Sequence, residues 1–379
     1  MHSNILYVGS YSELVAGDFG GHGDGISCLA FDAKNGKLKL LNDQFQVNPS
    51  YLSIGKIEGK NKTTNVLFAV SELLASKNPA IFCYTINDDY SLSLINKMPI
   101  EGGCPCHIEY FKNKDGESFI ACSCYETGNL IVNIIEPENF ENTNDLYNVF
   151  HKGSSKHPLR QTHPHTHCAF FDKREDKLLV ADLGLDQVNV YHTSKNEEGF
   201  NIKEIQSISL PPGSGPRHIC FDETHTYGFI INELSGSVTF IKHNFKNNVY
   251  EIKETVFAHD PVKESKKDSV ILDPDLGGAA IRVSPNGKFV YASMRGNNTI
   301  SLFAFDSVNE SLKYIACFTS GGLTPRDFCI DATGNWLLVA HQDSDTITIY
   351  NVNSSNGTLT LNNILENIKS PVCLSWLPK

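Results

Sequence analysis

The chain has 379 residues, of which 40% are hydrophobic and 20% are charged, an ordinary composition for a globular protein that buries a large core. Its formal net charge of −11 argues against nucleic acid or an anionic membrane as a partner, so any anionic substrate would need a locally basic pocket. No apolar run of about 18 residues is present, which excludes a predicted membrane span.

Short runs of alternating apolar residues predict β-strands from one end of the chain to the other. Residues 5–11, 25–32 and 37–43 come first, and after them a phrase recurs. In each copy a proline or small residue precedes one short run, and a polar turn leads to a second run. The copies lie at 48–72, 104–126, 163–184, 215–234, 278–295 and 324–342, with a partial copy at 370–378. Third runs follow at 187–192, 237–243, 299–306 and 346–352, and a weaker fourth run follows at 357–363.

The repeat predicts the architecture. Its anchors recur at intervals of 46–63 residues and are Pro49, Pro105, Pro164, Pro216, Ala279, Pro325 and Pro371. Four short strands per unit form one propeller blade, so we predict an all-β, seven-bladed β-propeller that occupies residues 1–379 as a single domain. The last anchor has only one strand after it, and the N-terminus lacks that strand. The C-terminal strand should therefore complete the N-terminal blade and leave no open sheet edge. Residues 260–275 are interpreted as an excursion at the rim, either a solvated loop or a lid.

Superimposing the repeats brings charged residues together at one mouth of the central channel. The position after each anchor should face the channel, and it holds Ser50, Cys106, His165, Arg217, Ala280, Arg326 and Val372. The end of the second strand should lie beside it, and it carries Glu72, Asp182, Glu233, Arg295 and Gln342. Together with His218 these residues predict a basic pocket, which favours an anionic substrate because arginine binds carboxylate and phosphate through two hydrogen bonds. The structural alternative is that the charged groups pair with one another around water.

The order and spacing of several phrases resemble the seven-bladed propeller lactonase family, which includes the propeller-type 6-phosphogluconolactonases and the fungal carboxy-cis,cis-muconate cyclases. The phrases are HPHTHCAFF, GSGPRHICF, NELSGSV, SPNGKFVYASMR and TPRDFCIDATGNWLLVAHQ, and the likeness spans nearly the whole chain. The resemblance implies catalytic roles for His165, Arg217, Glu233 and Arg295, and it matches Arg326 and Gln342 to further family positions. The crowding of Cys104, Cys106, Cys122 and Cys124 departs from the family pattern.

The resemblance implies a lactonase most similar to 6-phosphogluconolactonase, and the cationic channel positions argue against a metal ion, so no cofactor is expected. Water would attack the lactone carbonyl with Glu233 or His165 as the base, and Arg217 and Arg295 would stabilise the oxyanion. Arg326 and His218 would hold a phosphate or a second carboxylate, with Gln342 nearby. The muconate cyclase reaction could use the same pocket. A binding scaffold without activity is the alternative of another class, although the WD dipeptide of scaffold propellers is absent.

Metal sites were also considered. His163, His165 and His167 alternate along THPHTHC, but the repeat puts His163 in the turn before the strand and His167 deeper in the channel as a neutral, packed residue. The four clustered cysteines have poor spacing for zinc. Asp182 and Asp186 are better explained by a turn whose backbone amides Asp186 binds than by calcium. The 11 cysteines and the absence of an export signal indicate reduced thiols in a cytoplasmic protein that is a monomer or a weak homo-oligomer.

Overall fold

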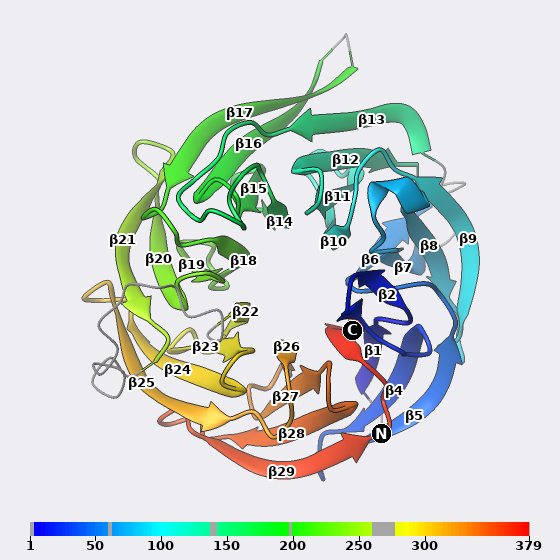
Figure 1. Ribbon diagram of the computed structural model, residues 1–379, viewed down its shortest axis with the longest axis vertical. Helices are drawn as coiled ribbons and strands as arrows, with labels where there is room; N and C mark the ends of the chain where they lie inside the picture. The colour runs from blue at the N-terminus through cyan, green and yellow to red at the C-terminus, as the bar shows by residue number, and fades with distance from the viewer. Residues whose placement is uncertain (1–3, 60–62, 137–141, 197–198, 260–276, 379) are drawn as a thin grey trace.

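The computed structural model describes residues 4–59, 63–136, 142–196, 199–259 and 277–378. Over these ranges the chain forms seven four-stranded antiparallel sheets, one small hairpin and one 3-10 turn, η1 (Ala75–Lys77). The sheets follow one another around a ring, as the blades of a propeller do (Figure 1). The predicted all-β, seven-bladed fold is confirmed. Within the described part no helix is long and apolar enough to cross a membrane. The excursion expected at 260–275 lies outside the described residues.

Each blade orders its strands from the channel outward (Figure 1). The innermost strands are β6 (Leu52–Glu58), β10 (Pro105–Lys112), β14 (Thr166–Asp172), β18 (Pro216–Phe221), β22 (Gly278–Val283), β26 (Pro325–Ile330) and β30 (Pro371–Trp376). The second strands are β1 (Asn4–Ser10), β7 (Thr63–Val70), β11 (Ser118–Cys124), β15 (Lys177–Asp182), β19 (Tyr227–Asn232), β23 (Phe289–Met294) and β27 (Trp336–His341). The third strands are β4 (Ile26–Asp32), β8 (Ala80–Ile86), β12 (Asn129–Ile135), β16 (Gln187–Asn196), β20 (Ser237–Asn244), β24 (Thr299–Asp306) and β28 (Thr346–Val352). The outer strands are β5 (Lys37–Gln44), β9 (Leu92–Pro99), β13 (Asn142–Phe150), β17 (Gly199–Ser209), β21 (Val249–Phe257), β25 (Ser311–Thr319) and β29 (Leu359–Glu366). The hairpin pairs β2 (Leu14–Ala16) with β3 (Phe19–Gly20).

Burial along the strands follows from their place in a blade. The second strand β11 is buried at every residue because neighbouring blades cover both of its faces. The outer strand β25 alternates exposed and more buried residues, since only one of its faces meets a neighbouring blade. The core is therefore distributed between the blades, as a series of apolar clusters around the ring.

The two ends of the chain meet in one blade. The C-terminal strand β30 pairs antiparallel with β1, with Val8 opposite Leu374 and Leu6 opposite Trp376. In Figure 1 the red C-terminal strand lies inside the blue N-terminal strands of the same sheet. This pairing confirms the predicted closure.

One backbone hydrogen bond recurs in all seven blades and sets the geometry of the channel mouth. One of the first two residues after each second strand donates its amide to a carbonyl that precedes the innermost strand, at 2.7–3.1 Å. The donors are Tyr11, Glu72, Tyr125, Leu183, Glu233, Arg295 and Gln342, and the acceptors are Ser370, Asn48, Cys104, His165, Gly215, Gly277 and Thr324, in the same order. Because this bond recurs at the same place in every blade, it identifies equivalent residues in different blades.

The residue two positions after each acceptor is the true channel position. These residues are Ser50, Cys106, His167, Arg217, Ala279, Arg326 and Val372. In all of these blades except that of Ser50, a register shift falls at this point, so the strand begins with a β-bulge, which turns a side chain out of the regular pleat. In five blades the sequence alignment predicts the same residue as the backbone hydrogen bond does. In the β14 and β22 blades it predicts His165 and Ala280, whereas the bond marks His167 and Ala279.

Glu109 lies in β10, three residues beyond the bulge residue Cys106. Its carboxylate accepts the amide of Phe171 at 3.2 Å and lines a second cavity of about 280 Å³ that Arg282 shares. Burial raises the pKa of Glu109 to about 8. The folded protein therefore binds this proton more tightly than the unfolded chain does, so ionisation of Glu109 destabilises the fold increasingly from about pH 4.5 to pH 8.

Glu109→Gln should therefore stabilise the protein at alkaline pH. We expect a gain of roughly 2–3 kcal/mol at pH 9, which allows for partial solvent screening, and little change at pH 4.5. Urea unfolding of both proteins at the two pH values measures this difference. An equal effect at both pH values would mean that Glu109 does not titrate as described.

Candidate active site

A cavity of about 800 Å³ opens at the channel mouth. Of the seven site residues predicted from the sequence, Glu233, Arg295, Arg326 and Gln342 line this cavity. His165, Arg217 and His218 do not reach its wall. The cavity is also lined by residues that were not predicted as site residues, including His167, Tyr125, Arg160 and Phe19.

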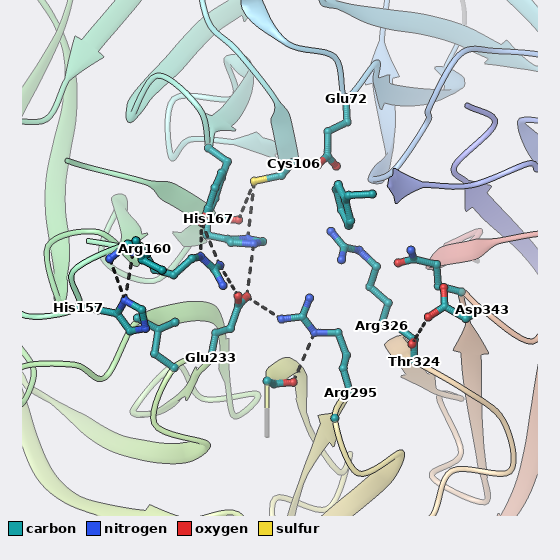
Figure 2. A pocket seen from close by; sticks show the side chains of 17 residues that line it. Glu72, Cys106, His157, Arg160, His167, Glu233, Arg295, Thr324, Arg326 and Asp343 are labelled. Carbon is teal, nitrogen blue, oxygen red and sulfur yellow. Dashed lines mark hydrogen bonds and ion pairs between the residues drawn. The ribbon is translucent and has the colours of Figure 1, made fainter. Parts of the chain in front are cut away.

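Glu233 is the centre of the charge network. It follows β19 directly, and its side chain is 5% exposed. Its Oε1 accepts a hydrogen bond of 2.6 Å from Nη2 of Arg160. Its Oε2 lies 3.0 Å from Nη2 of Arg295, 3.1 Å from Nε of Arg217 and 4.0 Å from Nε2 of His167. Figure 2 shows the side chains of Arg160 and Arg295 converging on Glu233 from different blades.

This network determines the ionisation of Glu233. Burial alone would raise the pKa of the carboxyl group, but the guanidinium groups of Arg295, Arg160 and Arg217 outweigh it and hold the pKa well below its usual range. Glu233 is consequently a carboxylate at neutral pH. It can accept a proton or a further hydrogen bond only when one or more of these guanidinium groups move away from its oxygens.

Arg217 lies behind the pocket wall. It is 2% exposed, and its Nη1 donates a hydrogen bond of 2.6 Å to the carbonyl of Ala279. Burial, with the nearby charges of Arg326 and Arg295, lowers the pKa of Arg217 to about 10, which leaves it protonated at neutral pH. Arg217 therefore contacts Glu233 and is not among the residues that line the cavity, and its predicted role toward an oxyanion stays a prediction.

The two histidines of the THPHTHC segment differ in position. The ring of His165 stacks on Tyr125 with centroids 4.3 Å apart, and its Nδ1 lies 2.7 Å from the carbonyl oxygen of Tyr125. His167 instead lines the cavity, with Nδ1 3.7 Å from Sγ of Cys106. Burial, reinforced by Arg217, lowers the pKa of His167 well below its usual value, so the imidazole is neutral at pH 7. The expectation of a neutral, buried His167 was right, but this histidine also faces the pocket.

His218 belongs to the layer of the channel beneath the pocket. It is 3% exposed and its ring packs against those of Tyr51, His107 and His167, with centroids 5.5–5.6 Å apart. Burial and the charge of Arg217 lower its pKa well below the usual value. His218 is not among the residues that line the cavity, so its predicted contact with a substrate anion stays a prediction.

The other side of the cavity carries a second charged cluster, in which a positive side chain and a negative one balance each other. Arg326 donates from Nη2 to the hydroxyl of Tyr11 at 2.8 Å, and that hydroxyl donates to Oε2 of Glu72 at 2.8 Å. Figure 2 places Arg326 and Glu72 across the pocket from Arg160. Gln342 donates from Nε2 to the carbonyl of Gly20 at 3.1 Å, while its buried Oε1 has no hydrogen-bond partner.

Asp182 was expected at the mouth, but Leu183 takes the position equivalent to Glu233. The carboxylate of Asp182 is fully buried, accepts the amide of His165 at 2.8 Å and lies 2.6 Å from Nδ1 of His151. Asp182 thus supports the blade from inside. Asp186 accepts the amides of Gly213 and Gly215 at 2.6 Å each, which confirms the turn interpretation.

Arg160 and Tyr125 are two residues of the cavity wall that the sequence reasoning did not single out. Tyr125 follows β11 at the position equivalent to Glu233, so a correct superposition of the repeats would have found it. Arg160 lies in the connection between β13 and β14, which has no counterpart in the repeat. No sequence signal marks it.

The cysteines of β10 and β11, and Cys104 before them, are buried free thiols in the structure. Over the described ranges, no three or more His, Cys, Asp or Glu side chains are arranged to hold a metal ion.

The comparisons with known proteins agree with this geometry. The family model for seven-bladed β-propeller lactonases matches residues 5–376. A 6-phosphogluconolactonase of Formosa agariphila is 31% identical over 363 residues, which cover 93% of this chain and 94% of the relative. A 6-phosphogluconolactonase of Bacillus subtilis is 26% identical over 380 residues, with 100% and 99% coverage. The crystal structure of a candidate 6-phosphogluconolactonase from Bacteroides fragilis matches with a TM-score of 0.82 at 26% identity, covering 99% of this chain and 98% of that one.

Proposed function

This chain belongs to the seven-bladed β-propeller lactonase family, and on that premise we propose that it hydrolyses an anionic sugar lactone, with 6-phosphogluconolactone as the first candidate substrate. The observation that carries the proposal is the ionised Glu233 at the wall of a cavity that Arg160, Arg295 and Arg326 also line. A net charge of −11 makes such a local concentration of arginines conspicuous. It suits a phosphate or carboxylate ligand, because guanidinium groups form charge-assisted hydrogen bonds to such anions.

The proposed reaction is addition of water followed by ring opening. The oxygen of a water molecule attacks the lactone carbonyl carbon while Glu233 takes one of its protons. Arg295 stabilises the negative charge that develops on the carbonyl oxygen. The tetrahedral intermediate then collapses, the bond from the carbonyl carbon to the ring oxygen breaks, and the ring oxygen receives the proton from Glu233. The product is an open-chain hydroxy acid.

His167 replaces His165 as the histidine of the mechanism. Since its imidazole is neutral at pH 7, it can accept a hydrogen bond from the attacking water or share its proton with Glu233. Arg326 adds a further positive charge to the wall of the cavity, and Gln342 lies beside it at the same wall. The proposal needs neither a metal nor a cofactor, and it includes a cytoplasmic location and a monomer or weak homo-oligomer.

Two other functions give different outcomes in the same assay. Muconate cyclase chemistry would also need arginines and a proton donor, so it is tested with carboxy-cis,cis-muconate as substrate. A binding scaffold would turn over neither compound. The gathering of charged side chains on one carboxylate favours an enzyme over a scaffold, for which scattered charges around an apolar cavity were expected.

The deciding experiment compares purified protein on 6-phosphogluconolactone, on its unphosphorylated analogue and on carboxy-cis,cis-muconate, each with and without EDTA. We expect kcat/KM to be at least about tenfold higher for the phosphorylated lactone, because loss of one charged contact weakens binding by about that factor. EDTA should have no effect. Turnover of the muconate alone would replace lactonase by cyclase, and loss of activity in EDTA would refute the metal-independent mechanism.

A further inference from the structure

The three arginines on Glu233 are not equivalent. Arg217 and Arg295 lie close to Oε2, and their side chains are 3% and 22% exposed. Arg160 alone holds Oε1, its side chain is 41% exposed, and it comes from the β13–β14 connection. Only Arg160 among the three makes a well-aligned hydrogen bond to the carboxylate. Oε1 is therefore occupied by the most accessible and most easily displaced of the three cations.

The backbone around Arg160 is held, so movement would be limited to its side chain. The neighbouring Gln161 donates from Nε2 to the carbonyl of Leu183 at 2.8 Å, and Ser155 donates to Asp186 at 2.6 Å. The amide of Arg160 lies 3.1 Å from Nδ1 of His157. By contrast, the guanidinium group donates one hydrogen bond to the carboxylate of Glu233 at 2.6 Å. It also donates to the hydroxyl of Tyr125 at 3.0–3.2 Å. A long side chain on a fixed loop can exchange one anion for another without any change of fold.

We propose that Arg160 binds the anionic group of the substrate and in doing so leaves Oε1 of Glu233, so that substrate binding itself frees the carboxylate to take a proton from water. The inference rests on the proposed lactonase function. Arg160 is then a substrate-binding residue in the complex and a blocking residue in the free protein.

Charge balance supports this exchange. Three guanidinium groups and one carboxylate leave the cluster with a net charge of +2, which a phosphate dianion would neutralise. Arg217 cannot be the group that moves, since it is enclosed and bonded to the carbonyl of Ala279. Arg160 can turn toward the cavity that it already lines. A carboxylate that loses one of three cations regains basicity, because burial then weighs more heavily on its charged form.

The kinetic test compares the pH profiles of wild type and Arg160→Met. The profile of kcat/KM reports the free enzyme and that of kcat reports the complex. In the wild type, the acid limb of kcat should lie at higher pH than that of kcat/KM, because Glu233 loses a cation on binding. In Arg160→Met this gap should narrow, with the kcat/KM limb moving to higher pH. The substrate's own phosphate ionisation contributes equally to both proteins.

Arg160→Met should also raise the KM for the lactone about tenfold to a hundredfold, while kcat changes much less. Arg160→Lys keeps the charge and should shift the kcat/KM limb less than Arg160→Met does. Arg174→Met is the matched control: Arg174 lies in the β14–β15 turn at the far end of β14, is 47% exposed, and should leave both profiles unchanged.

A binding experiment tests the exchange without turnover. Calorimetric titration of inorganic phosphate and of 6-phosphogluconate, in two buffers of different ionisation enthalpy on the acid limb, measures proton uptake. Wild type should take up more protons than Arg160→Met does. If no lactone is hydrolysed, the proposed function fails, and this titration still decides on Arg160. Equal uptake by both proteins, or an unchanged gap between the limbs, would overturn the inference.

Discussion

Glu233→Gln is expected to lower kcat for lactone hydrolysis by about 10³-fold, in the middle of the range of effects for removing a positioned general base. Glutamine has the size of glutamate and can still accept a hydrogen bond from Arg160, but it cannot take a proton from water. The acid limb that Glu233 gives to the profile should disappear together with the rate. Steady-state kinetics at saturating substrate, from pH 4 to pH 7, measure both changes.

Loss of the charge also affects the fold, and this effect must be separated from the rate. Removal of Glu233 leaves Arg160, Arg217 and Arg295 without their common anion, and breaking such a buried cluster costs about 3–5 kcal/mol. Added phosphate should restore part of this stability in a thermal melt, since it supplies the missing negative charge.

Glu109→Gln is the matched control for chemistry. It removes another buried carboxylate of the same channel at the cavity that Arg282 lines, and it should leave kcat unchanged. A folded Glu233→Gln protein with more than about a third of the wild-type kcat would exclude Glu233 as the base and would leave it a purely structural anion.

The fold could be predicted from the sequence because the strand pattern of one blade recurs seven times along the chain. Alternating apolar runs specify strands, and the incomplete repeats at the two ends predicted that β30 would pair with β1. No single blade would have carried that conclusion, since one four-stranded sheet is compatible with many all-β folds. The seven anchors in the sequence indicated a seven-bladed propeller among these all-β folds.

The anchor residue marks the bulge most directly where it is also the first residue of the strand. In the blades of Arg217 and Arg326, proline is the first strand residue and the bulge follows it at once. In the β14 blade the strand starts at Thr166, two residues after Pro164, so the proline gave the wrong register.

A better signal was present in the strand itself. In the innermost strands an apolar residue that is buried lies two positions after the residue marked by the backbone hydrogen bond, as Ala169, Ile219 and Phe328 do. Counting back from Ala169 identifies His167. Side-chain alternation is enforced by the core, whereas proline is merely tolerated at a strand start, which is why the apolar residue is the more reliable marker.

The difference between the two histidines gives the second large effect. His167→Gln is expected to reduce kcat at pH 7 by about 10²-fold, because this neutral imidazole is the one that lines the cavity near Oε2 of Glu233. His165→Gln should stay within about threefold of wild type, since that ring lies against Tyr125 with its Nδ1 occupied by a carbonyl. Both variants are assayed on the same lactone at saturation, and their thermal midpoints are compared.

Comparing His165→Gln with His167→Gln separates the effect of strand register from the general effect of losing an imidazole. Both substitutions remove an imidazole from one short segment, both keep a side chain that can form hydrogen bonds, and both imidazoles are buried, at 7% and 5% exposure for His165 and His167. A nonspecific loss of packing would therefore impair the two proteins alike. A large loss in His165→Gln with little in His167→Gln would contradict the channel position set by the recurring backbone hydrogen bond, because that bond makes His165 the acceptor and His167 the bulge residue aimed at the cavity. The ratio of the two kcat values is thus a direct functional measure of the strand register in this blade.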